Sequence, residues 1–86
     1  MFYVYIIKSK LDNKLYFGST NNLKERILEH KNKKVKSTKY RGNFTLIYCE
    51  CYKSEKDARI RERNLKYFGK AYAQLKKRLK NSLTEE

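Results

Sequence analysis

A strand that is apolar on both faces constrains this chain more than any other feature. Residues 2–8 form a strand-like segment, and successive strand residues point to opposite faces of a sheet. Both faces are apolar here: Phe2, Val4 and Ile6 lie on one, and Tyr3, Tyr5 and Ile7 on the other. Such a strand must be covered on both sides. The fold therefore has to pack other elements against both faces of this strand.

The remaining segments supply those elements. Asp12-Asn13 signals a turn, and strands are expected over residues 14–18 and 44–52. Helices are expected up to about Lys31, from Ser54 onward, and over residues 70–82. The order β-β-α-β-α-α predicts an α+β fold in which a small three-stranded antiparallel sheet is flanked by helices. At 86 residues the chain is long enough for one core, so we expect one domain over 1–82 and a frayed tail over 83–86.

The first two strands predict a hairpin. Pairing Ile7 with Lys14 would place Tyr5 opposite Tyr16 on the same face. The two phenols would then be cross-strand neighbours. Thr20 or Asn21 is expected to cap the helix that follows.

Charge indicates the class of partner. The net charge is +13, since 22 Lys and Arg face nine Asp and Glu. This positive field favours a polyanion, with nucleic acid as the first candidate and an anionic membrane as the second, although a solubilising lysine surface without function is also open. Interleaved tyrosines suit phosphate contacts combined with base stacking. The candidate phosphate-contacting lysines follow the first helix: Lys31, Lys33, Lys34 and Lys36.

Two cysteines two residues apart, Cys49 and Cys51, lie in the third strand. With one histidine they cannot complete the roughly four ligands of a structural zinc site, and strand neighbours at this spacing bridge poorly. We expect buried, reduced thiols and a cytoplasmic protein, since no segment of the sequence resembles a signal peptide or a membrane span.

Polar residues occupy positions where core residues are expected. Arg26 and His30 fall on the stripe of the first helix that carries Leu23 and Ile27. This leaves Glu25 and Glu29 on the outer face.

In the second helix Glu62 lies on the inner stripe between Ala58 and Leu65. An inward carboxylate needs a cation, which a metal ion or Arg26 would supply. The Arg26 alternative is a salt bridge without a catalytic role.

The spacing of the tyrosines, the glycine and Arg26 along the chain resembles that of a known family. Tyr3-Val4-Tyr5 is followed eleven residues after Tyr5 by Tyr16-Phe17-Gly18, and Arg26 comes ten residues after Tyr16. Together with the helical glutamate, this order resembles the GIY-YIG endonuclease family, and the chain looks most like its short standalone members, with similarity to the nuclease domain of bacterial excision repair. The matching set is Tyr5, Tyr16, Gly18, Arg26, His30 and Glu62.

The resemblance implies a nuclease that cuts DNA phosphodiesters, duplex or branched, in repair or recombination. It implies one divalent metal held by Glu62, with Mg²⁺ expected and Mn²⁺ possible, and no small-molecule cofactor or membrane. Arg26 would hold the phosphate. Tyr16, supported by Tyr5, would activate or orient water, or His30 would act as the base instead. Gly18 would let the chain turn from strand to helix near DNA.

The chain also departs from the family pattern. Tyr3 replaces a glycine, Phe17 an isoleucine, and Ser19 a basic residue of the repair branch. A family asparagine near the last helix has only Gln74 and Asn81 as candidates. Two other functions therefore stay open: a catalytically weak nucleic-acid-binding module of the same fold, and a small basic RNA-associated protein whose tyrosines are core residues.

Overall fold

The computed structural model, which describes residues 1–35 and 43–84, contains a three-stranded antiparallel sheet. Its strands are β1 (Phe2–Ser9), β2 (Leu15–Thr20) and β3 (Phe44–Tyr52), in the spatial order β2-β1-β3. The strand with two apolar faces is the central one, and its residues Val4 to Ile7 are buried. The expected fold class, an α+β domain built on such a sheet, is confirmed.

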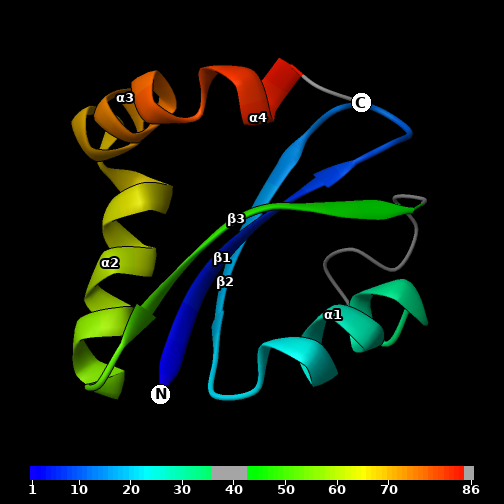
Figure 1. The fold of residues 1–86 in the computed structure, drawn as a ribbon, viewed down its shortest axis with the longest axis horizontal. Coiled ribbons are helices and arrows are strands. Elements are labelled where there is room, and N and C mark those ends of the chain that lie inside the picture. The colour runs from blue at the N-terminus through cyan, green and yellow to red at the C-terminus, as the bar shows by residue number, and fades with distance from the viewer. Residues whose placement is uncertain (36–42, 85–86) are drawn as a thin grey trace.

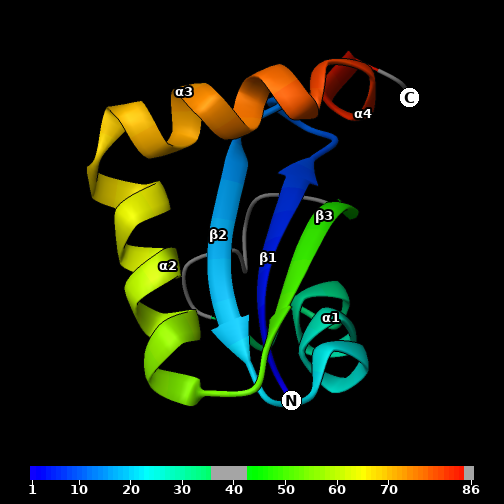
Figure 2. The same ribbon diagram turned by 60° about the vertical axis from the view of Figure 1, so that its left-hand side comes forward.

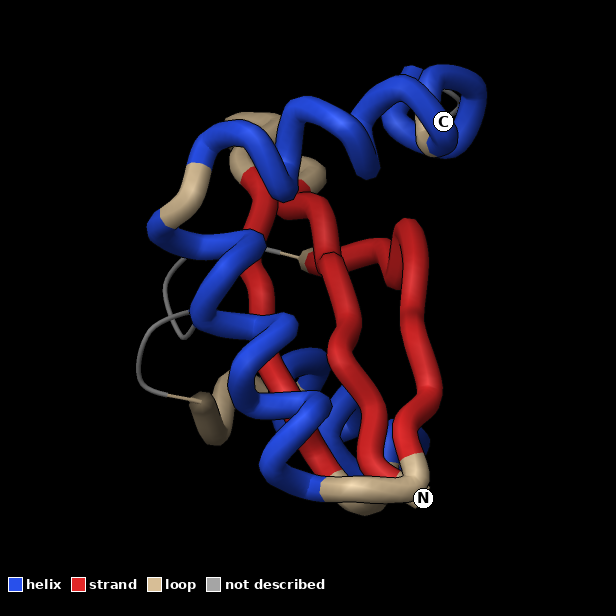
Figure 3. The backbone as a smooth tube through the Cα atoms, turned by 90° about the vertical axis from the view of Figure 1, so that its left-hand side faces the viewer, coloured by secondary structure: helices blue, strands red, loops and turns tan. Residues whose placement is uncertain are grey.

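Helices cover the two faces of the sheet unequally. Helix α1 (Leu23–Lys31) lies on one face of the sheet (Figure 1). The other helices come after β3 in the chain: α2 (Glu55–Tyr67), α3 (Gly69–Arg78) and α4 (Lys80–Thr84). Figure 3 shows the strands between α2 in front and α1 behind. The main core lies on the α2 side, where Val4 and Ile6 pack against three helical residues, Ala58, Leu65 and Leu75, and against Leu79 at the end of α3. In the described residues no helix is long and apolar enough to cross a bilayer.

The hairpin register differs from the expected one by two residues. Tyr5 pairs with Gly18 and Ile7 with Tyr16. The connection spans residues 10–14, where Asn13 N–H donates to Ser9 O at 3.0 Å and Asn13 adopts the left-handed φ of 61°. Asparagine tolerates this conformation well. A register shift of two residues leaves every side chain on the same face of the sheet. Tyr5 and Tyr16 therefore still lie on one face, as diagonal neighbours across the two strands.

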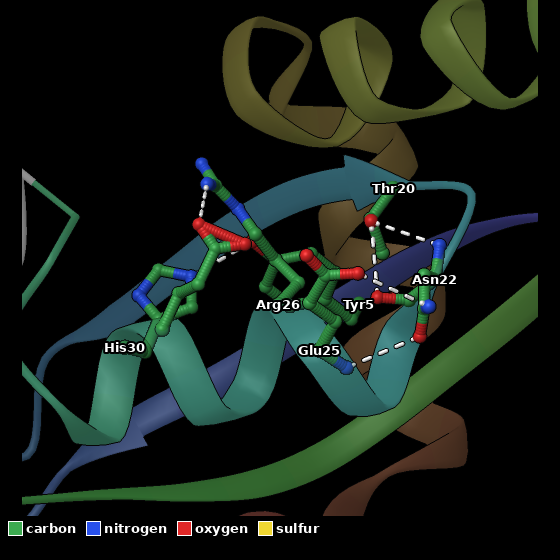
Figure 4. Close-up of polar contacts among 7 residues, drawn as sticks. Tyr5, Thr20, Asn22, Glu25, Arg26 and His30 are labelled. Carbon is green, nitrogen blue, oxygen red and sulfur yellow. Dashed lines mark hydrogen bonds and ion pairs between the residues drawn. The ribbon is translucent and has the colours of Figure 1, made fainter.

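Helix boundaries follow their caps. Asn22, rather than Thr20 or Asn21, caps α1, and its side chain accepts from Glu25 N–H at 3.1 Å. Its amide donates back to the Glu25 carboxylate at 3.2 Å, which satisfies two groups at one helix end (Figure 4). Ser54 caps α2 as expected, accepting from Asp57 N–H.

The single helix expected over residues 70–82 is two helices. Buried Leu79 separates α3 from α4, and Leu83 in α4 packs against the core. Residues 83 and 84, expected in a frayed tail, are therefore helical; residues 85 and 86 lie outside the described part.

The third strand carries an irregularity and two exposed thiols. The β1–β3 register shifts between Ile6 and Ile7, so that Ile47 and Tyr48 both pack towards the main core. Cys49 and Cys51 are free, but both are exposed rather than buried. They lie on an edge strand, on the face opposite the main core, where Cys49 pairs with Tyr5 and Cys51 with Tyr3.

A polar cluster joins α2 to β3. The Arg61 guanidinium donates to both carboxylate oxygens of Glu50, with Nε 2.9 Å from Oε1 and Nη2 3.0 Å from Oε2. The hydroxyls of Tyr48 and Tyr52 donate to the same carboxylate at 2.7 and 2.5 Å. Burial alone would raise the pKa of Glu50, but these four donors outweigh it and hold the pKa below its usual range. Burial, followed by the hydrogen bond to the same carboxylate, raises the pKa of each tyrosine to about 12.

This cluster makes a stability prediction. Arg61→Ala leaves the half-buried Glu50 carboxylate without its cation and should lower the free energy of unfolding by about 1–2 kcal/mol. The loss is not larger because both side chains are partly exposed and solvent screens the pair. Arg59→Ala is the matched control, because Arg59 forms an exposed pair with Glu55 on the same helix. It should cost less than about 0.5 kcal/mol. Urea unfolding followed by circular dichroism measures both, and equal losses would contradict a structural role for the Glu50 cluster.

Candidate active site at the free edge of β2

The five side chains expected to form the site line one open cavity of about 510 Å³: Tyr5, Tyr16, Arg26, His30 and Glu62. Gly18, Ser19 and Lys66 line it as well. Residues from two strands and two helices, 61 positions apart in the chain at most (5 to 66), therefore meet at one place.

The cavity wraps around the free edge of β2. Tyr16 and Gly18 point towards the α1 side of the sheet, because they share the face of Tyr5 and Ile7. Ser19 pairs with Val4 and points towards the α2 side, where Glu62 lies. The five side chains therefore reach one cavity from both sides of the sheet, because β2 is an edge strand of the described sheet.

Tyr5 and His30 form a buried pair. Tyr5 Oη and His30 Nε2 lie 2.8 Å apart, and the two residues are 2% and 4% exposed. Burial raises the pKa of the Tyr5 phenol, although the neighbouring Arg26 opposes the rise. Burial, followed by the Arg26 charge, lowers the pKa of His30. Both groups are therefore neutral near pH 7.

Gly18 makes room for this pair. A Cβ on Gly18 would lie 2.5 Å from Tyr5 Cζ and closer still to the hydroxyl oxygen. Gly18 does not form the expected turn into the helix, since β2 continues through it to Thr20. Its role is steric: the absence of a side chain lets the Tyr5 ring cross over β2.

Arg26 stands at the mouth of the cavity. The neighbouring Tyr5 hydroxyl raises the pKa of the guanidinium. Its Nη1 also lies 3.4 Å from Glu29 Oε2, and both side chains are 36% exposed. Glu29 thus lies beside the site rather than on the outer face as expected. Figure 4 shows Tyr5, Arg26 and His30 together at α1.

Glu62 is held from both sides. Ser19 Oγ donates to Glu62 Oε1 at 2.6 Å, and Lys66 Nζ lies 2.7 Å from Oε2. The cation beside this inward carboxylate is therefore Lys66, and the alternative of a Glu62–Arg26 salt bridge is wrong. The Glu62 side chain is 19% exposed and faces the open cavity.

Tyr16 is the more accessible phenol of the site. Its ring packs edge-on against Phe44 at a centroid distance of 5.4 Å, and its residue is half-buried on the cavity wall. His30 contacts the same Phe44 ring at 6.0 Å. Phe44 thus supports both site residues from β3.

The donor set suits one hydrated divalent cation. Within residues 1–35 and 43–84 no cluster of three or more His, Cys, Asp or Glu side chains gathers to enclose a metal. One carboxylate beside an open cavity fits Mg²⁺, which retains several waters and often takes only one or two protein carboxylates. Binding there requires Lys66 to give up one oxygen of Glu62.

The other sequence candidates lie outside this cavity. Lys31, Lys33 and Lys34 are exposed at the end of α1, and Lys36 is outside the described residues. Gln74 and Asn81, the candidates for a family asparagine, are exposed on α3 and α4 and do not line the cavity.

Sequence reasoning overlooked Ser19 and Lys66 as partners of Glu62. The sequence could have indicated Lys66, because it follows Glu62 by four residues and so lies on the same helix face. It could not have indicated Ser19, since only the packing of α2 against β2 brings this residue to the carboxylate.

Known proteins are similar to this chain in sequence and in fold. Residues 1–71 match the profile of the GIY-YIG catalytic domain. The chain is 45% identical over 67 residues to a UPF0213 protein of Clostridium perfringens, covering 77% of this chain and 71% of that one. It is 44% identical over 69 residues to a UPF0213 protein of Staphylococcus haemolyticus, covering 79% and 83%. The solution NMR structure of the UPF0213 protein BH0048 from Bacillus halodurans superposes with a TM-score of 0.56 at 30% identity, over 98% of this chain and 95% of that one.

The buried imidazole makes stability depend on pH. His30 is the sole histidine, so its titration can be followed by proton NMR without interference. We expect a pKa below the ordinary value of about 6.5. As pH falls through about 6.5 the unfolded chain binds a proton that the folded chain does not, so the free energy of unfolding should decrease until the folded pKa is reached.

Urea unfolding between about pH 7.5 and 5.5 measures this effect, and His30→Gln should flatten the profile over that window. A His30 pKa at or above about 6.5 would contradict the burial of the neutral form.

Proposed function

The chain belongs to the GIY-YIG family of nucleases, and on this basis we propose that it is a divalent-metal-dependent endonuclease that hydrolyses DNA phosphodiester bonds. The observation that carries the proposal is the single cavity lined by Tyr5, Tyr16, Arg26, His30 and Glu62. Phosphodiester hydrolysis needs a bound phosphate, a positioned water and neutralisation of the charge that develops. The lining provides a group for each requirement.

Arg26 is the phosphate ligand. Its guanidinium is permanently charged, half-exposed and at the cavity wall. Its planar donors match two phosphate oxygens. The contact with Glu29 is long, at 3.4 Å, and surface pairs of this kind are weak, so phosphate can replace it.

The two tyrosines have different roles in this proposal. Tyr16 is half-buried on the cavity wall, so its hydroxyl can contact and orient the attacking water or accept its proton. His30 is almost fully buried and its Nε2 is already bonded to Tyr5, so it acts through Tyr5 rather than on water. The Tyr5–His30 pair would position Arg26, because the Tyr5 hydroxyl neighbours the guanidinium and both residues line the same cavity.

Glu62 would hold the metal. The ion, Mg²⁺ or Mn²⁺, would supply charge neutralisation at the phosphate and lower the pKa of a bound water. Ser19 fixes the carboxylate by donating to Oε1, which leaves the Oε2 side, now beside Lys66, facing the cavity.

A second candidate is a nucleic-acid-binding module of the same fold that does not cleave. The Glu62–Lys66 ion pair at 2.7 Å favours it, because an ammonium occupies the carboxylate that a metal would need. Cleavage assays with added metal decide between the two.

Single-turnover cleavage of plasmid, flap and branched DNA with Mg²⁺ or Mn²⁺ tests the proposal. Glu62→Gln should abolish cleavage while binding persists or tightens, because the amide keeps the shape but loses the charge that holds the metal. Tyr16→Phe should slow cleavage by about 10²-fold or more with little change in binding, because it removes one hydroxyl. Arg26→Ala should weaken both.

Glu55→Gln is the matched control, since Glu55 is a carboxylate on the same helix that pairs with Arg59 in solvent. It should cleave like the parent. Cleavage that survives in purified Glu62→Gln would indicate a contaminating nuclease, and absence of cleavage in the parent would leave the binding module as the function.

Binding itself should depend steeply on salt. With a net charge of +13, phosphate contacts release counterions from DNA, so the logarithm of the binding constant should fall linearly with the logarithm of salt concentration. Fluorescence anisotropy of a labelled duplex at several salt concentrations measures the slope. A binding constant that is insensitive to salt would contradict phosphate contacts by the basic surface.

A further inference from the structure

An exposed aromatic pair marks the corner between α2 and α3. Tyr67, the last residue of α2, is 76% exposed, and Phe68, between the two helices, is 58% exposed. Among the described large hydrophobic residues that are exposed, Tyr67 is the most exposed. Apolar area held in water at this level, on adjacent aromatic residues, is typical of a surface that binds something.

The position of Tyr67 ties it to the active site. A second open cavity of about 360 Å³ is lined by Arg59, Arg63 and Tyr67, and also by three residues that line the site cavity: Ser19, Glu62 and Lys66. The two cavities thus share one wall, and a ligand leaving the Glu62 carboxylate along α2 reaches Tyr67. Figure 2 shows α2 running beside β2 up to this corner.

The chemistry of this second cavity is cationic as well as aromatic. Arg59, Arg63 and Lys66 lie on one stripe of α2 at spacings of four and three residues. Arg59 is paired with Glu55 and Lys66 with Glu62. Within the described part of the chain no salt bridge holds Arg63, which is exposed and therefore available to an anion.

This combination selects one class of ligand. Duplex phosphates require cations but offer no exposed base face to a tyrosine ring, because the bases are stacked within the helix. An apolar peptide would use the rings but gain nothing from the arginines. Unpaired nucleotides use both, since their phosphates contact cations and their bases stack on aromatic rings.

We propose that Tyr67 stacks on an unpaired base of the substrate strand while Arg63 contacts its phosphate, so that the enzyme favours DNA with a single-stranded segment beside the scissile bond. This inference rests on the proposed function and names the substrate feature that the same site selects. Phe68, the next residue, extends the apolar surface at the corner.

Binding in the absence of metal tests the proposal. The probes are a labelled blunt duplex and the same duplex carrying a single-stranded tail, measured by fluorescence anisotropy. Tyr67→Ala should weaken binding of the tailed DNA about tenfold, because a base stacked on an aromatic residue contributes on the order of that factor. Binding of the blunt duplex should change less than about twofold, since it presents no unpaired base.

Three variants separate stacking from other effects. Tyr67→Phe keeps the ring and should bind like the parent. Arg63→Ala should lower the salt slope for tailed DNA by about one, whereas Tyr67→Ala should leave that slope unchanged. Leu11→Ala removes a hydrophobic side chain that is 71% exposed in the distant hairpin connection, and it should change neither affinity.

The outcomes distinguish this inference from the proposed function. Equal loss of both DNA affinities in Tyr67→Ala, or no loss in either, overturns the stacking site even if the parent cleaves DNA. Selective loss for tailed DNA in a parent that does not cleave supports the stacking site and removes the nuclease function. Circular dichroism of each variant verifies that the exposed substitutions leave the fold intact.

Discussion

The contact between Tyr5 and Gly18 is the constraint on which the rest of the structure depends. Tyr5 lies on the central strand, and its ring occupies the space that a side chain on Gly18 would fill. This contact lets the phenol reach His30 on α1, so one side chain connects two strands and a helix. Arg26, one turn earlier on α1, neighbours the same hydroxyl. A larger residue at position 18 would displace the ring and, with it, both helix residues.

Two inward-facing glutamates, Glu50 and Glu62, differ in the partners that bind their carboxylates. Glu50 and Glu62 are similarly exposed, at 14% and 19% of their side chains. Glu50 accepts from Arg61 and two tyrosine hydroxyls, which fill both oxygens and fasten α2 to β3. Glu62 has one serine hydroxyl and one flexible lysine, and it lines an open cavity. The first is committed to the fold, while the second can exchange its cation for a ligand.

The placement of the site on an edge strand has a consequence for binding. Because β2 is an edge strand within the described residues, α1 and α2 both reach the cavity from opposite faces of the sheet. A long polymer can pass such an edge without entering a closed pocket. Charge supports the same conclusion, since a net charge of +13 favours a polyanionic ligand.

The sequence by itself determined the strands, the helix that begins after Ser54 and the identity of five cavity-lining residues. It did so because apolar periodicity, caps and the spacing from Tyr5 to Tyr16 to Arg26 are local signals. It placed the hairpin two residues out of register and the two cysteines in the core, since a strand pattern does not reveal where its turn is centred or which strand is at an edge. Only the tertiary structure decided that Lys66 and Ser19, rather than Arg26, hold Glu62, because that choice depends on where α2 meets β2. It also decided that Gly18 serves the ring of Tyr5 and not a turn, a steric relation between residues 13 positions apart that no local pattern encodes.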